Sequence, residues 1–178
     1  MFPMIKGGKG GSKTTKSGLT FEKRVDLRSV FQGIKGYSVN ENKLFFKGKL
    51  LARLYKKYDI YKKFLPEQGI DWALKLSKKL LPDEAIFVLS NKTLFIIEMK
   101  FQEDSRFVYE DLQTCRFKKI QFTKLLDKKG MNLEYIYFLD NHFKHSKYKD
   151  ILDYVHEVGC HYFFEELPLN FLGFEQTR

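Results

Sequence analysis

Two apolar segments joined by a short polar turn constrain the fold of this chain more than any other feature. Residues 85–89 and 93–97 are almost entirely apolar, and the pair Asn91-Lys92 lies between them. Asn is suited to the positive φ of a tight turn, so we predict a β-hairpin over residues 85–101. Strands this apolar are typical of a sheet whose two faces are both covered by helices.

The remaining pattern predicts helices and strands that alternate along the chain. Residues 107–129 place Val108, Leu112, Cys115, Phe122 and Leu126 on one stripe at helical spacing. A helix between strands 93–101 and 133–139 implies a crossover connection and hence a partly parallel sheet. We expect an α/β fold, a mixed central sheet flanked by helices, in one domain over residues 18–178. The other expected helices are 19–32, 70–80 and 148–158, with strands in 37–46 and 160–164, while 49–64 is ambiguous.

The charge of the chain indicates an anionic partner. With 32 Lys and Arg against 22 Asp and Glu, the net charge is +10, which favours nucleic acid before a membrane surface. Residues 1–17 are predicted to be a flexible basic arm, either a solvated tail or a segment that follows phosphates. No stretch approaches the ~20 apolar residues of a membrane span. There is no apolar signal-peptide core, and two isolated cysteines fit a reducing cytoplasm.

Charged residues stand where the second apolar strand ends. Glu98 and Lys100 point to the same face of the strand, roughly 6.5–7 Å apart, and Asp83 precedes the partner strand. Two neighbouring carboxylates can hold Mg²⁺, which acidifies a bound water and offsets the charge that builds on phosphorus. A nearby Lys can orient that water, so the trio suits phosphodiester hydrolysis. The alternative is a surface salt bridge worth about 0–1 kcal/mol.

The same residues carry a resemblance to a known family. Pro82-Asp83, followed by Glu98-Met99-Lys100 at the end of an apolar strand, resembles the PD-(D/E)XK nuclease superfamily. The segment Gly18–Glu22 is similar to the Gly-Leu-x-Phe-Glu opening of some type II restriction endonucleases. Leu112-Gln113-Thr114 and the basic residues after it resemble the helix that follows the active strand in such enzymes. The resemblance covers roughly residues 18–164.

The resemblance implies a restriction-endonuclease-like core and a metal-dependent site. Asp83 and Glu98 would be metal ligands together with the Met99 carbonyl, Lys100 would position the water, and Glu22 would lie near the metal. Glu84, next to Asp83, remains an alternative ligand. The implied metal is Mg²⁺, with Mn²⁺ able to replace it, and no small-molecule cofactor is expected.

The implied activity is that of a type II restriction enzyme, an endonuclease that cuts double-stranded DNA at a specific sequence. Palindromic cutting needs two sites and therefore a homodimer. Other readings are a repair or junction-resolving nuclease, an RNA-directed nuclease, and a non-catalytic basic DNA-binding module. Expected DNA contacts, chiefly to phosphates, are Lys13, Lys16, Gln113, Arg116, Lys118, Lys119 and Lys124.

Some of these polar residues also have plainer explanations. Lys119 falls inside the apolar stripe of 107–129, and its stem is expected to extend out of the core. Gln113 could equally be a solvent-exposed side chain. The polar loop 140–147, with Asn141, Lys144 and Lys147, could enter a DNA groove. Its histidines lack partners at zinc spacing and are expected to be ordinary loop residues.

Overall fold

The computed structural model describes residues 18–20, 26–101, 105–126 and 129–174. Three of the expected functional residues, Lys13, Lys16 and Glu22, lie outside this part of the chain, as does the whole of the expected N-terminal arm. Their predicted roles therefore stay predictions.

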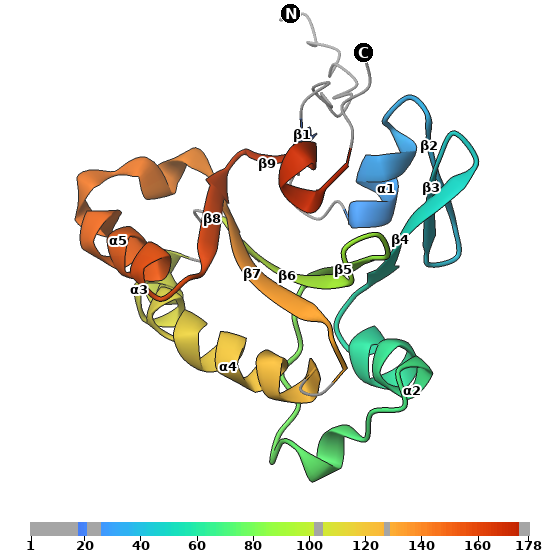
Figure 1. The fold of residues 1–178 in the computed structure, drawn as a ribbon. Coiled ribbons are helices and arrows are strands. Elements are labelled where there is room, and N and C mark those ends of the chain that lie inside the picture. Colours follow the sequence, from blue (N-terminus) through green and yellow to red (C-terminus); the bar gives the residue numbers. More distant parts are fainter. Residues whose placement is uncertain (1–17, 21–25, 102–104, 127–128, 175–178) are drawn as a thin grey trace, which may run out of the picture.

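The chain forms a mixed α/β structure with two sheets and helices on both sides (Figure 1). The strands are β1 (Gly18–Thr20), β2 (Tyr37–Asn40), β3 (Lys43–Phe46), β4 (Lys49–Tyr55), β5 (Glu84–Val88), β6 (Thr93–Lys100), β7 (Asn132–Leu139), β8 (His161–Phe164) and β9 (Glu166–Pro168). The α-helices are α1 (Leu27–Gln32), α2 (Leu65–Glu67), α3 (Ser105–Gln113), α4 (Cys115–Leu126) and α5 (Lys149–Glu157). A π-helical turn, Ile60–Phe64, precedes α2, and 3₁₀ turns cover Trp72–Leu74, Asn141–Lys144, Ser146–Tyr148 and Leu169–Leu172.

The main sheet has seven strands in the order β2-β3-β4-β5-β6-β7-β8. The pairs from β2 to β6 are antiparallel, whereas β6, β7 and β8 run parallel. Both the predicted hairpin β5–β6 and the predicted crossover from β6 to β7 are confirmed. The carboxyl ends of β6, β7 and β8 therefore meet at one edge of the sheet.

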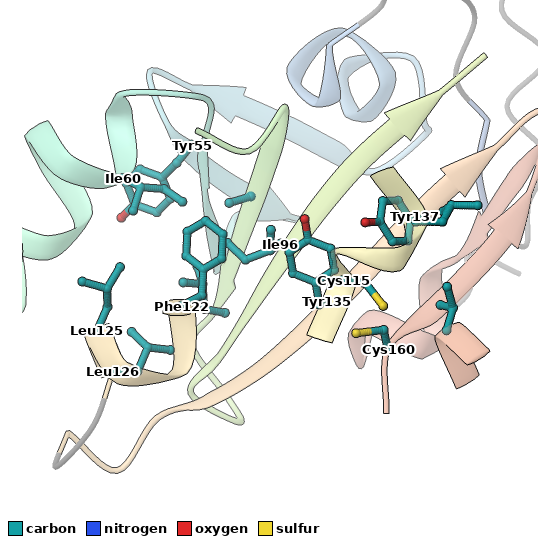
Figure 2. Close-up of a cluster of buried hydrophobic side chains, with 14 of the residues drawn as sticks. Tyr55, Ile60, Ile96, Cys115, Phe122, Leu125, Leu126, Tyr135, Tyr137 and Cys160 are labelled. Carbon is teal, nitrogen blue, oxygen red and sulfur yellow. The ribbon is translucent and has the colours of Figure 1, made fainter. Parts of the chain in front are cut away.

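A separate apolar core covers each face of the main sheet. One lies under α3, α4, α5 and the turn before α2, and Figure 2 shows part of it, with Phe122 and Tyr135 packed together. The other lies under α1, the small antiparallel sheet β1–β9 and the last 3₁₀ turn. Figure 1 shows these two groups of elements on opposite sides of the sheet. The hairpin strands are buried throughout β5 and over most of β6, which confirms that both of their faces are covered.

The expected helix over residues 19–32 is wrong at its start. Gly18–Thr20 form β1, which pairs with β9, and α1 begins only at Leu27. Asp26 caps α1, because its Oδ1 accepts a hydrogen bond of 2.9 Å from the Ser29 amide. Leu19 of β1 and Leu27, Val30 and Phe31 of α1 thus belong to two elements that pack against the same core.

The expected helix over residues 70–80 does not form. Only Trp72–Leu74 make a 3₁₀ turn, and the Leu74 side chain is 85% exposed. Ile70, Trp72, Leu74 and Leu76 recur every two positions, as in an extended segment, although Trp72, Leu76 and Leu80 also keep a four-residue helical spacing. The apolar pattern therefore fits an extended segment as well as a helix. The end of the segment is held by a hydrogen bond of 2.9 Å that the Tyr61 hydroxyl donates to the Leu80 carbonyl.

The long helix expected over residues 107–129 is two helices, α3 and α4, with a break at Thr114. The Thr114 amide and hydroxyl both donate to the Asp111 carbonyl, at 3.1 and 2.6 Å, instead of continuing the regular ladder. Such local bonds from threonine compete with helix hydrogen bonding. The predicted apolar stripe itself is buried as expected.

Two smaller segments also depart from, or resolve, the sequence-based expectation. In the hairpin turn it is Lys92 that takes positive φ, at 51°, while the Asn91 side chain accepts from the Thr93 amide. The ambiguous stretch 49–64 divides into β4 and the π-helical turn.

In the part of the chain that the structure describes, none of the helices has both the length and the apolar character that crossing a membrane requires.

Candidate active site

The hairpin register places Asp83 beside Glu98. Glu84, the first residue of β5, pairs with Ile97, so Asp83 lies just beyond the end of the ladder, next to Glu98, whose pKa its charge raises. Asp83 Oδ2 accepts a hydrogen bond of 2.9 Å from the Met99 amide, which fixes the carboxylate against the end of β6. The sequence left this register open; in the structure the Asp83 carboxylate lies at the end of β6, near that of Glu98.

Glu98 is a buried carboxylate, only 8% exposed. Its Oε1 accepts a hydrogen bond of 3.2 Å from the Tyr135 hydroxyl on β7. Burial raises the pKa of Glu98 to about 7; the nearby Asp83 charge adds to this rise, while Lys118 and Lys100 oppose it. Near neutral pH this group is therefore poised between its neutral and charged forms, and a bound cation would favour the charged form.

Lys100 points to the same face as Glu98 and forms an ion pair with Asp111 of α3. Asp111 also holds Lys118 of α4, with 3.0 Å between Lys118 Nζ and Asp111 Oδ1. Burial alone would lower the pKa of Lys100, but the bond to Asp111 and the charges of Glu98 and Asp83 outweigh it and raise that pKa. Both lysine side chains are mostly buried, at 17% and 19% exposure, so this cluster is not a surface salt bridge.

Asp111 is fixed from several directions. Its carbonyl accepts from the Tyr137 hydroxyl at 3.0 Å and from Thr114. Burial would raise the pKa of its carboxyl group, but the two lysine partners lower it. The helix break at Thr114 thus sets the position of the carboxylate that organises Lys100 and Lys118.

Glu84 lies on the other face of the sheet. It alternates with Ala85 along β5 and belongs to the side covered by α1, where Ile86 and Val88 pack. Burial raises the pKa of Glu84 to about 7, the Asp26 charge adds to this, and the Leu27 amide opposes it by donating to the carboxylate. The geometry therefore favours Asp83 over Glu84 as the partner of Glu98.

The two carboxylates fit a hard divalent cation that keeps several water ligands. Among the described residues no group of three or more His, Cys, Asp or Glu side chains is placed to hold a metal. Mg²⁺ is commonly held by only one or two carboxylates with water and phosphate oxygens. Asp83, Glu98 and the main chain of Met99, which meet at the end of β6, meet that requirement.

The expected DNA-binding residues of α3 and α4 separate into three groups. Lys118 belongs to the carboxylate cluster itself. Gln113, Arg116 and Lys124 are exposed. Lys119 is half-buried, and its ammonium group donates to the Gly159 carbonyl, as the explanation of a stem extending from the core predicts.

Sequence reasoning missed two residues of this site. Asp111 and Tyr135 come from elements that only the crossover brings to the end of β6. Asp111 lies one helical turn before Cys115 in a helix read mainly for its apolar stripe. The available signal was an acid seven residues before Lys118, just ahead of the basic residues that form α4.

Comparison with known proteins gives little further information. No protein-family model matches the chain, and no solved structure matches it significantly. One curated relative, the small ribosomal subunit protein uS8m of Dictyostelium citrinum, is 37% identical over 49 residues. The match covers 28% of this chain and 32% of that protein, so the chain spans about a third of the relative's length.

Proposed function

We propose that this chain is a Mg²⁺-dependent endonuclease that hydrolyses phosphodiester bonds of double-stranded DNA, with a restriction-endonuclease-like core. The observation that carries the proposal is the meeting of Asp83, Glu98 and Lys100 on one face at the end of β6. The parallel arrangement of β6 and β7, with helices on both faces, supports it. The net charge of +10 suits a polyanionic substrate.

The residues of the site divide the chemical work between them. Asp83, Glu98 and the Met99 carbonyl would hold the Mg²⁺ ion, which supplies an acidified water and offsets phosphate charge. Lys100 donates hydrogen bonds toward the attacking water or the scissile phosphate. Lys118 adds a second ammonium group to bind the phosphate, and Asp111 keeps both lysines in place. Mn²⁺ is expected to replace Mg²⁺.

The finer assignment is a type II restriction enzyme acting as a homodimer on a specific sequence. It depends on the resemblance of Pro82-Asp83 and Glu98-Met99-Lys100 to the PD-(D/E)XK superfamily. A repair or junction-resolving nuclease would share the same site and differ only in what it recognises. The product pattern separates these two possibilities.

A second candidate is a non-catalytic basic DNA-binding module. The ion pair between Lys100 and Asp111 favours it, because a lysine that already has a carboxylate partner also serves a structural purpose. The surroundings of Glu98 argue against it: a carboxylate with a pKa of about 7 that lies beside a second carboxylate and two lysines is typical of functional sites.

The deciding experiment is DNA cleavage by purified protein. Plasmid and phage DNA are incubated with Mg²⁺, with Mn²⁺ and with excess chelator. Discrete fragments indicate restriction, a smear indicates non-specific cutting, and a gel shift without cutting indicates a binding module. Asp83→Asn and Lys100→Ala should abolish cutting, while Asp59→Asn and Lys63→Ala, an ion pair elsewhere, should leave it intact. Full activity in both site variants would refute the assignment.

A further inference from the structure

A cavity opens beside the end of β8, apart from the carboxylate cluster. It encloses about 320 Å³, within the range of small-ligand sites, and lies between the turns after β7, helix α5 and strand β8. Lys144 and Lys149 line it on one side, and the rings of Tyr162 and Phe164 on another. The polar loop 140–147, which on sequence grounds could enter a DNA groove, forms two 3₁₀ turns, and residues 144–146 line this cavity.

The cavity shares an edge and a face of the sheet with the candidate active site. The register places Glu98 level with Tyr137 and Tyr162, and Lys100 level with Leu139 and Phe164. Register partners in a parallel sheet point to the same face. Two strand spacings separate β8 from β6, so the rings stand roughly 10 Å from the candidate metal ligands. A distance of roughly 10 Å is short enough for a nucleotide in the cavity and a phosphate at the candidate active site to belong to neighbouring positions of one DNA strand.

The lining suits a ligand that is both anionic and flat. Lys144 Nζ lies over the Phe164 ring, 5.2 Å from its centroid. Lys149 is paired with Asp153 at 2.6 Å, so Lys144 is the better placed of the two to bind an anion. Tyr162 and Phe164 are half-buried and stand nearly perpendicular, with 5.5 Å between centroids. One of their faces can stack on a base while the lysine binds the adjoining phosphate.

We propose that this cavity binds one unpaired nucleotide of the DNA strand next to the scissile phosphate. Bases inside a duplex are stacked on one another and cannot reach an aromatic wall, so the ligand is an overhang, a flap or an extruded base. This inference rests on the proposed nuclease function, because it concerns the substrate of that same site. It adds that the substrate is recognised partly through an unpaired base, which favours substrates that contain a break or a junction.

The test compares two DNAs that differ only in an overhang. A blunt duplex and the same duplex with a single-stranded overhang carrying 2-aminopurine are titrated with protein in chelator, so that cutting cannot occur. Anisotropy gives the affinity, and quenching of 2-aminopurine reports stacking. Wild-type protein should bind the overhang DNA more tightly and quench the probe.

Two cavity variants and one control decide the result. Phe164→Leu keeps apolar packing but removes the ring face, and Lys144→Ala removes the cation; each should weaken overhang binding at least about fivefold. Blunt-duplex binding should change less than about twofold, and the Lys63→Ala control should alter neither. Thermal melting checks that the variants are folded.

Several outcomes would overturn the proposal. Equal affinity of wild-type protein for both DNAs, or equal losses for both in the variants, would show only general phosphate attraction. Free dAMP that competes as well as the overhang DNA would mark a mononucleotide site instead. The binding titration contains no Mg²⁺, so it can be interpreted even if the protein does not cleave DNA. If the protein cleaves DNA but binds the two DNAs equally, the cavity proposal is refuted and the proposed nuclease function is not.

Discussion

Replacing Glu98 by Gln should make the protein more stable at mildly alkaline pH while removing its activity. The pKa of this carboxyl group rises from 4.5 to about 7 on folding, mainly through burial. The folded protein therefore binds the extra proton between pH 4.5 and about 7, and its stability falls as the pH rises through that window. A shift of this size corresponds to about 3 kcal/mol at most.

The Gln variant avoids that cost because it cannot ionise, and its side-chain oxygen can still accept the Tyr135 hydrogen bond. At about pH 8 we expect the variant to be more stable than wild type by up to about 3 kcal/mol. At about pH 4, where Glu98 is protonated in both states, the difference should fall below about 1 kcal/mol. Urea unfolding followed by circular dichroism at both pH values measures this.

Magnesium supplies the second arm of the experiment. With Mg²⁺ at ten times its Kd, wild-type protein should gain about 1.4 kcal/mol, and Glu98→Gln should gain almost nothing. Glu84→Gln is the matched control, since Glu84 is equally buried and its pKa is also about 7, but it faces the other core. It should show the same pH effect and keep the magnesium effect.

The result that refutes this reasoning is a Glu98→Gln protein destabilised by the same amount at both pH values. Such a result would mean that the carboxylate charge is already compensated in the folded protein. A magnesium effect lost in Glu84→Gln and kept in Glu98→Gln would instead move the metal to the other face of the sheet.

Three further predictions concern the site and its support. DNA cleavage should rise through about pH 7 as Glu98 loses its proton, and the midpoint should move to lower pH as Mg²⁺ is increased, because metal and proton compete; a midpoint independent of Mg²⁺ would contradict this. Asp111→Asn should lower the free energy of unfolding by about 1–2 kcal/mol and slow cleavage more than it weakens DNA binding. The control Asp59→Asn should lower the free energy of unfolding, measured in urea, by less than about 0.5 kcal/mol. Gly36→Ala should cost about 2–3 kcal/mol, since φ is +88° and the new Cβ would lie 2.8 Å from Phe46, while Gly48→Ala, with φ +79° and open space, should cost only about 1 kcal/mol in thermal melts.

Local patterns predicted the parts of this fold that depend on local rules. Strand alternation placed Glu98 and Lys100 on one face, and the helix between strands predicted the parallel pairing of β6 and β7. The helix expected over residues 70–80 does not form, and the apolar spacing there fits an extended segment as well as a helix. The break at Thr114 was missed because it depends on one side-chain hydroxyl that bonds to the Asp111 carbonyl.

The site was only half predictable for a related reason. Asp83 and Glu98 meet through a hairpin register that the turn sets, and there Lys92, not Asn91, has positive φ. Asp111 reaches Lys100 only because α3 packs across the end of β6. Contacts of this kind follow from how elements stack, and neither residue spacing nor charge in the sequence specifies them.

The charge balance of the site suits the proposed nuclease function. Within the described residues, three carboxylates (Asp83, Glu98 and Asp111) lie near two ammonium groups (Lys100 and Lys118), which leaves an excess of one negative charge when Glu98 is ionised. A cluster kept only for stability has no reason to bury that charge, because replacing or removing it would strengthen the fold. A divalent cation turns the excess from one negative to one positive charge, which is what a phosphodiester needs for binding and for its transition state. Under the proposed function, the raised pKa of Glu98 is the cost of keeping the site ready for that cation.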